Sequence, residues 1–230
     1  MCGRYFWTND AEDALEEDFP ELVGQILQQA DSLRAGDYTP AMKAMALVGG
    51  ASSGPASGTG SIASGNANGS LADITGRESG SPRRELTPQV LQWGFPGFDK
   101  GKLLINARAE SVKDRPTFSR SFEQGRCVLP AAGFYEWDRS KEKVTFTVPD
   151  RPILYLAGIW RPYGPEKRFV ILTREANASM APVHDRMPLI LTREEVAPWV
   201  GERAEAERLL VKELPMLKAE RPYEQLTFEW

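Results

Sequence analysis

Cysteine and histidine are scarce in this chain, which has two cysteines and one histidine among 230 residues. Two cysteines cannot build a disulfide framework or supply four ligands to a zinc ion, so we expect no metal site. We also expect no bound cofactor. Long hydrophobic runs are also absent, because nothing approaches the roughly 18 consecutive apolar residues of a membrane span. Acidic residues from Asp10 onward argue against a secretory signal, and we therefore predict a cytoplasmic protein that does not bind membranes.

A large net charge is lacking too. The formal charge of -4 at pH 7 argues against a protein that coats nucleic acid by charge alone. The charges are nevertheless uneven: residues 10–37 contain nine acidic residues and one basic residue, whereas residues 77–126 contain ten basic and six acidic ones. A positively charged face is therefore compatible with the acidic total, although charges scattered over a solvated surface are the commoner reason for so small an excess.

Length and composition favour one domain over residues 1–230, which we expect to be monomeric. Residues 49–81 are mostly Gly, Ser and Ala and contain hardly any large apolar side chain. Such a segment cannot bury enough surface to offset its ordering entropy, so we predict a flexible insertion. Because apolar, strand-like segments lie on both sides, it is interpreted as a long hairpin connection within the domain.

The remaining sequence predicts an α+β fold with a mainly antiparallel, barrel-like β core and peripheral helices. Helices are expected over residues 9–19 and 20–33, and Thr192 with Glu195 forms the capping box of a third helix that continues to Pro215. Runs of β-branched and aromatic residues predict strands over residues 42–48, 88–95, 102–110, 125–137, 143–148, 152–160 and 167–173.

Cys2 follows the initiator methionine in MCGRYFW. If Met1 is removed, this one residue holds both a thiol and a free α-amine with a pKa near ~8. An aldehyde can then form an imine with the amine, and the thiol can close a five-membered thiazolidine ring. The alternative is that Cys2 is an incidental small residue near a mobile terminus.

Three other residues could take part in chemistry. His184 is the only side chain that titrates near neutrality without perturbation, although a lone histidine is more often structural. Strand alternation in AAGFYEWD places Glu136 on the same face as Phe134, where burial would favour proton transfer; the alternative is an edge strand with the carboxylate in water. Asn106 and Arg108 in INARAES share one strand face.

Five separated motifs occur together: MCGRY, QWGF, INARAES, PAAGFYEW and HDRMPLIL. Their order resembles the SOS response-associated peptidase family, whose members shield abasic sites in single-stranded DNA by covalent crosslinking. The resemblance implies that Cys2 forms the thiazolidine with the ring-opened sugar and that Glu136 moves protons during this step and during removal of Met1. It also implies that His184 acts on the opening sugar oxygen and that Asn106 holds the terminus and the sugar.

The resemblance further implies single-stranded DNA as partner, with nucleoid association when DNA is damaged. Arg4, Arg108 and Arg186 would bind phosphates beside the lesion, and Trp93 and Phe95 would stack on bases, unless these rings belong to the core. One departure is the segment GDYTPAMK, which lacks the asparagine that family members have there, so a polar contact to DNA is missing or replaced.

Two rival functions fit parts of the sequence. Amidotransferases with an N-terminal nucleophile also begin with methionine, cysteine and glycine, and there the thiol attacks an amide. A non-catalytic single-strand-binding module would bind intact and abasic strands alike and would not need Cys2. Ammonia release from glutamine, or a denaturation-resistant DNA adduct, separates the three.

Overall fold

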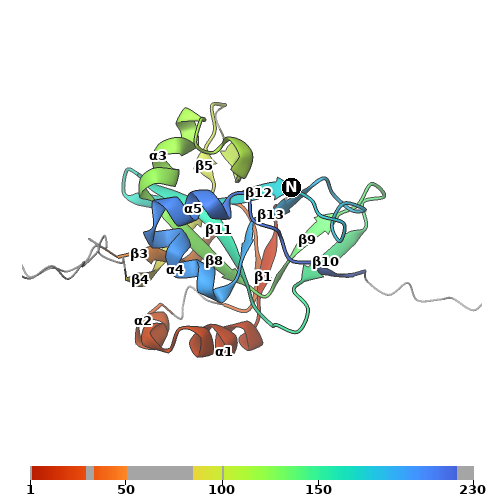
Figure 1. Ribbon diagram of the computed structural model, residues 1–230, viewed down its shortest axis with the longest axis horizontal. Helices are drawn as coiled ribbons and strands as arrows, with labels where there is room; N and C mark the ends of the chain where they lie inside the picture. The colour runs from red at the N-terminus through yellow and green to blue at the C-terminus, as the bar shows by residue number, and fades with distance from the viewer. Residues whose placement is uncertain (1, 30–33, 51–84, 100, 222–230) are drawn as a thin grey trace, which may run out of the picture.

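The structure, a computed structural model, describes residues 2–29, 34–50, 85–99 and 101–221 (Figure 1). Five strands of the larger sheet close into a ring, because β12 pairs with β4 on one side and with β11 on the other. In ring order these are β12 (Glu166–Glu175), β4 (Leu86–Trp93), β3 (Lys43–Gly49), β8 (Arg126–Ala131) and β11 (Leu154–Tyr163). The predicted α+β class with a barrel-like β core is confirmed.

Strand β8 is buried along its whole length. One face lines the barrel, and helix α4 (Arg193–Gly201) packs against it from outside. At its start the buried Arg126 guanidinium donates hydrogen bonds to Phe122 O at 2.7 Å and to Trp199 O at 2.5 Å. These carbonyls lie in the last turns of α3 (Pro116–Gln124) and α4, where helices leave acceptors unpaired. Arg126 therefore fastens two helix ends to the barrel.

A second sheet lies beside the barrel, on the right in Figure 1, with strand order β15-β10-β9-β1-β2. Its strands are β1 (Tyr5–Trp7), β2 (Gly36–Tyr38), β9 (Gly133–Trp137), β10 (Lys143–Thr147) and β15 (Lys218–Glu220). Gly133 begins β9 where the Phe6 ring crosses it, because an added Cβ would lie 2.6 Å from that ring. Alternation along β9 buries Phe134 and Glu136, as predicted, and leaves Trp137 exposed.

The helices differ in part from the prediction. Helix α1 (Asn9–Asp18) begins at the cap Thr8, but residues 20–29 form a 3-10 turn (Pro20–Leu22) and the short α2 (Val23–Leu27); residues 30–33 lie outside the description. The capping box of α4 is confirmed. The predicted continuation to Pro215 is wrong, because α5 spans only Arg203–Leu209 and the chain then turns away. Helix α3 was not predicted.

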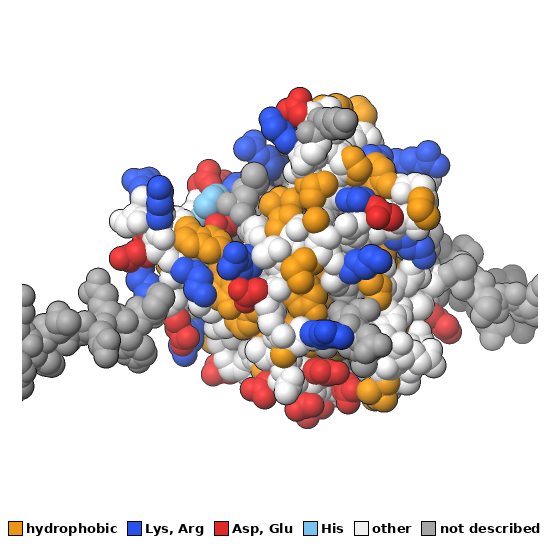
Figure 2. All heavy atoms as spheres, turned by 180° about the vertical axis from the view of Figure 1, so that it is seen from behind, with side chains coloured by type: hydrophobic (Ala, Val, Ile, Leu, Met, Phe, Trp, Pro, Cys, Tyr) orange, Lys and Arg blue, Asp and Glu red, His pale blue; other side chains and the backbone are white. Residues whose placement is uncertain are grey.

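Acidic side chains are most concentrated at one end of the molecule, although others lie among the basic ones elsewhere. Figure 2 shows acidic side chains gathered along the bottom of one face, where Figure 1 has α1 and α2, and Lys and Arg side chains over the middle and top. The acidic segment of the sequence thus forms one end of the fold.

None of the described helices combines the length and apolar character needed to cross a bilayer.

The Gly/Ser/Ala-rich segment connects neighbouring strands. In the β3–β4 pair Gly49 lies opposite Leu86 in antiparallel register, as a hairpin connection requires. Residues 51–84 lie outside the described part of the chain, so the flexible insertion over 49–81 stays a prediction.

Candidate functional site

Cys2 lies at the corner where the second sheet meets the barrel, and its relative exposure is 1%. Asn106 Nδ2 donates a 3.0 Å hydrogen bond to Cys2 O, and the thiol donates a long contact of 3.9 Å to Arg4 O. Asn106 begins β7 (Asn106–Arg108), which pairs with the barrel strand β12. An interaction across 104 positions therefore fixes the backbone of the proposed nucleophile.

Glu136 reaches the same corner from β9. Strand β1 pairs with β9 through Tyr5 and Phe134, and Tyr135 N–H donates to Arg4 O at 2.9 Å, which continues the pairing toward Cys2. The Glu136 side chain is 4% exposed, so the edge-strand alternative is excluded. Burial first, and the nearby Glu136 carboxylate second, raise the pKa of the Cys2 thiol to about 12. The thiol is therefore protonated at neutral pH.

His184 lies near the surface with a side-chain exposure of 24%, and Figure 2 shows the histidine in pale blue on that face. Its Nδ1 accepts the Arg186 N–H at 2.9 Å, which leaves Nε2 to hold the proton of the neutral ring. Asp185 Oδ1 is also 2.9 Å from Nδ1 and would accept a hydrogen bond if the ring gained a second proton. This geometry suits a proton donor held by its own loop.

Arg186 begins β13 (Arg186–Pro188), which pairs with β12 close to where β7 pairs with it. Its guanidinium donates two hydrogen bonds of 2.8 Å to Glu110 and one of 2.6 Å to Thr173 O. Hydrogen bonding to Arg186 lowers the pKa of Glu110 to about 2. The charge predicted to bind a phosphate is therefore already paired, and a phosphate would have to replace Glu110.

The other two arginines are more open. Arg4 has a side-chain exposure of 39%, lies 3.4 Å from Asp37 Oδ2, and places its guanidinium 5.4 Å from the ring centre of Trp137. Arg108 is exposed and forms no ion pair with any residue that the structure describes. Both guanidinium groups are therefore accessible to an anion from solvent.

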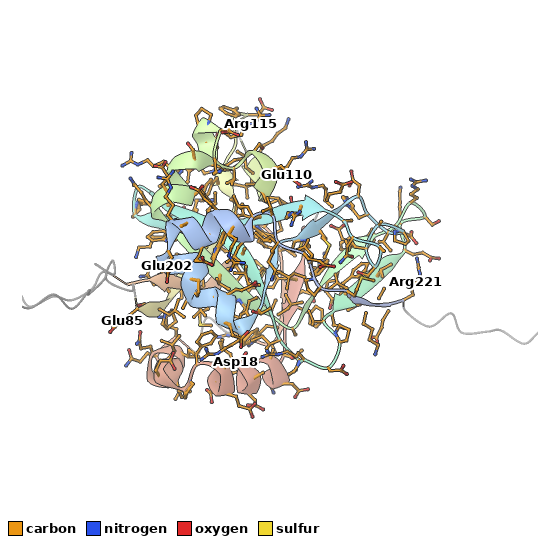
Figure 3. All side chains as sticks on the ribbon, viewed as in Figure 1. Asp18, Glu85, Glu110, Arg115, Glu202 and Arg221 are labelled. Atoms are coloured by element: carbon orange, nitrogen blue, oxygen red, sulfur yellow. The ribbon has the colours of Figure 1, made fainter. Side chains whose placement is uncertain are left out.

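A hollow of about 560 Å³ opens beside Asn106. Arg115 contributes to its lining, and Figure 3 labels Arg115 and Glu110 in the upper part of the molecule. Arg108 and Asn106 contribute polar groups and Phe118 an apolar wall. Phe98, at the rim, is 93% exposed. The hollow thus combines cations and an accessible aromatic ring with Asn106, whose amide donates to Cys2 O.

Trp93 and Phe95 were predicted to stack on bases at the surface, but the structure buries them, with exposures of 1% and 0%. Trp93 Nε1 donates to Ile105 O at 2.9 Å, and its ring stacks on Phe169 with centroids 5.9 Å apart. Both rings are core residues, as the alternative interpretation held, and neither has a face on which a base could stack. The apolar interior of a closed barrel outweighs the tendency of aromatics to mark binding surfaces.

A sequence model of the family described as SOS response associated peptidase (SRAP) matches residues 1–228. The chain belongs to the SRAP family. Among its curated relatives, the abasic site processing protein YoaM of Bacillus subtilis is 33% identical over 127 residues, which are 49% of this chain and 56% of YoaM. HMCES of Mus musculus, also named an abasic site processing protein, is 27% identical over 201 residues, 66% of this chain and 53% of HMCES. The chain therefore spans about half the length of these relatives.

Solved structures support the fold of this SRAP chain. A crystal structure of a protein from Bordetella bronchiseptica covers 97% of the chain and 100% of its own, with a TM-score of 0.65 and 19% identity. A second, from Bacteroides thetaiotaomicron, covers 58% of the chain and 68% of its own, with a TM-score of 0.51 and 28% identity.

Two exposed aromatics of the SRAP chain escaped the sequence reasoning. Phe98 lies between Gly97 and Asp99 in a tight connection after β5 (Phe95–Pro96), and a large ring in a glycine-flanked turn is a signal that could have been used. Trp137 is 38% exposed, and its position follows from the same alternation that buries Glu136.

Among the described residues, no group of three or more His, Cys, Asp or Glu is arranged to hold a metal ion.

Proposed function

We propose that this SRAP protein processes abasic sites in single-stranded DNA by forming a thiazolidine between Cys2 and the aldehyde of the ring-opened deoxyribose. The observation that supports this most is the convergence of three segments on one residue. Asn106 holds the Cys2 carbonyl at 3.0 Å, and Glu136 is buried close enough to raise the thiol pKa. A hollow lined by Asn106 and Arg108 adjoins them. The names of the relatives agree with this substrate.

The chemistry begins after removal of Met1, which frees the Cys2 amine. The amine adds to the sugar aldehyde carbon, and loss of one water gives an imine. The thiol sulfur then adds to the same carbon, and its proton passes to the imine nitrogen, which closes the five-membered ring. Aldehyde and cysteine thus become thiazolidine and water, with no oxidant or cofactor.

The protonated thiol explains the order of these steps. In the chain that still carries Met1, burial raises the thiol pKa to about 12, so the sulfur is a poor nucleophile at neutral pH. We therefore assign the first attack to the amine freed by removal of Met1, whose ordinary pKa near ~8 leaves an uncharged fraction. Glu136 is the carboxylate beside the sulfur, and we assign it the transfer of protons between thiol, amine and departing water. His184, with its proton on Nε2, is assigned to the sugar oxygen that is released on ring opening.

Recognition has no base to read at the lesion and must use the backbone and flanking bases. Arg108 and Arg115 at the hollow, with Arg4 beside Trp137, are assigned to flanking phosphates. Phe98 is the accessible ring at the hollow, and stacking of a base on such a ring contributes about 1–3 kcal/mol. We therefore assign base stacking to Phe98, in place of Trp93 and Phe95, for which the sequence predicted it.

Intact mass spectrometry of the purified chain, before and after incubation with an abasic oligonucleotide, tests the proposal. We expect a starting mass without Met1 and a product whose mass is the sum of protein and oligonucleotide minus one water. The same strand without an abasic site should give no product. Ammonia release from glutamine without an adduct would instead identify an amidotransferase, and equal noncovalent binding of both strands without an adduct would identify a binding module.

A further inference from the structure

A second hollow uses a later part of α3 and shares no lining residue with the hollow beside Asn106. It has a volume of about 640 Å³ and is formed by the last turn of α3 and the end of β11. Gly125 joins the two walls closely, since Trp160 N–H donates to Gly125 O at 2.6 Å and an added Cβ at Gly125 would overlap that strand. Typical small-molecule sites have volumes of about 300–1,000 Å³, so this hollow can hold a small ligand.

Two buried donors in its walls have no partner. Ser121 is 1% exposed, and its hydroxyl forms no hydrogen bond with any described residue. Arg161 Nε is likewise buried without an acceptor, although the same guanidinium donates to the Tyr163 hydroxyl. Buried donors are normally satisfied, and because these two belong to residues that line one hollow, a ligand that accepts hydrogen bonds there would satisfy them.

The charge of the hollow indicates that this ligand is an anion. Arg161 stacks on Phe95 and Tyr163, at 5.1 and 4.6 Å from the ring centres, and has no carboxylate within ion-pair distance among the described residues. Its cross-strand neighbour Arg168, in contrast, is neutralised by Glu166 at 2.5 Å. Arg120 adds a second cation at the exposed side. A half-buried cation without a counter-ion is costly, and an oxyanion would compensate it.

No acidic side chain opposes this assignment. The lining residues are Arg120, Ser121, Gln124, Gly125, Trp160, Arg161, Pro162 and Tyr163, and none is a carboxylate. Glu123, the acidic residue of α3, instead lies 3.8 Å from Arg203 of α5. The hollow is therefore cationic on both walls, with the half-buried rings of Trp160 and Tyr163 beside the charge.

We propose that this hollow is a phosphate-binding subsite for a nucleotide, in which Arg161 Nε and the Ser121 hydroxyl donate to phosphate oxygens and Arg120 closes the open side. The phosphate belongs either to a free mononucleotide or to the backbone of a DNA strand, and the chemistry of recognition is the same in both. The site is separate from Cys2 and needs no covalent step.

Isothermal titration of the full chain tests the subsite with inorganic phosphate, thymidine 5′-monophosphate and thymidine. We expect the two phosphate compounds to bind and thymidine, which has no phosphate, not to bind. Arg161→Met keeps the apolar stem but removes the donor and the charge, and should weaken binding at least tenfold. Ser121→Ala removes one unpartnered hydroxyl without disturbing a hydrogen bond, and should weaken binding about threefold.

Arg151→Met is the matched control. It removes the same charge at the other end of the molecule, where Arg151 pairs with Asp18 (Figure 3), and should leave phosphate binding unchanged. Titration of a ten-nucleotide thymidine strand then identifies the source of the phosphate. If Arg161→Met also weakens this binding and lowers the salt slope by about one, the subsite serves the strand; if only the mononucleotide is affected, it serves a free nucleotide.

The proposal is overturned if the wild-type chain binds neither phosphate compound, or if Arg161→Met and Ser121→Ala bind them as the wild type does. Cys2→Ala should retain phosphate binding, and Arg161→Met should still form the adduct at saturating DNA. Loss of the subsite and failure of the proposed crosslink are therefore distinguishable.

Discussion

Both cysteines are buried thiols with raised pKa values, but the residues around them differ. Cys127 lies on β8 in the barrel wall, 0% exposed, where a Cβ added at Gly158 would touch its sulfur at 3.0 Å. Burial raises its pKa well above the ordinary value. Burial likewise raises the pKa of Cys2, but Cys2 has Asn106 on its carbonyl and the Glu136 carboxylate beside its sulfur. Burial alone makes a thiol inert, so the reactivity that we propose for Cys2 must come from the amine freed by removal of Met1 and from the polar neighbours of Cys2.

Substituting each cysteine separately is the sharpest way to break this comparison. Cys2→Ala should abolish the abasic-site adduct completely while keeping much of the noncovalent DNA binding, because the ring cannot close without sulfur. Cys127→Ala should form the adduct at the wild-type rate. Denaturing gel electrophoresis with an abasic oligonucleotide measures both, and a persistent adduct in Cys2→Ala would refute the assignment.

The next largest effect on the crosslinking rate should come from substitution of Glu136, the carboxylate near Cys2, because the pKa of Cys127 is raised by burial alone. Glu136→Gln keeps the shape of the side chain but cannot exchange protons, so we expect crosslinking to slow by about 100-fold, at the lower end of general acid–base contributions. Single-turnover rates at saturating DNA give the value. Thermal unfolding serves as the control for folding, and a rate equal to that of the wild type would remove Glu136 from the mechanism.

Substitution of Cys127 in the barrel wall should lower the free energy of unfolding and leave the rate of crosslinking unchanged. Cys127→Ser places a hydroxyl where the structure has apolar neighbours, and an unsatisfied buried hydroxyl costs about 1–3 kcal/mol. Urea unfolding should show this loss with crosslinking unchanged. Cys127→Ala is the matched control, since it removes the sulfur without adding a polar group and should lose less stability than the serine variant.

The smallest effect should appear at alkaline pH, where the two sites behave alike. Each thiol has a higher pKa in the folded chain than the ordinary value near ~8.5, so the folded state holds more protons above that pH. Stability is therefore complete below about pH 8.5 and falls as pH rises toward the folded pKa values. Urea midpoints at pH 7 and pH 10 should fall less in Cys2→Ala and in Cys127→Ala than in the wild type; identical slopes would contradict the burial effect.

Local patterns predicted those features that local physics decides. Alternation along residues 133–137 correctly buried Glu136, and the spacing of Thr192 and Glu195 correctly began a helix. The capped helix was extended too far, because nothing in the composition before Pro215 shows that the chain turns away after Leu209. The same reasoning missed α3, although Pro116 stands at its start, Gly125 follows its end, and Phe118 and Phe122 lie one helical turn apart.

Long-range pairing explains the remaining differences at the site. Arg186 is neutralised by Glu110 across 76 positions, and Trp93 meets Phe169 only because β4 and β12 pair in parallel. Arg161 and Arg168 are both arginines on paired strands, yet only Arg168 finds a carboxylate. No periodicity in the sequence distinguishes a paired arginine from an unpaired one.

The sequence by itself determined which groups this protein offers: a thiol at position 2, on a residue that would also hold a free amine after removal of Met1, one imidazole, and a carboxylate on the inner face of a strand. Those follow from covalent structure and from the two-residue period of a strand. The tertiary structure alone decided which side chains are held together and which remain available, because closure of the barrel brings Asn106 to Cys2 and buries Trp93 and Phe95 while leaving Phe98 in solvent.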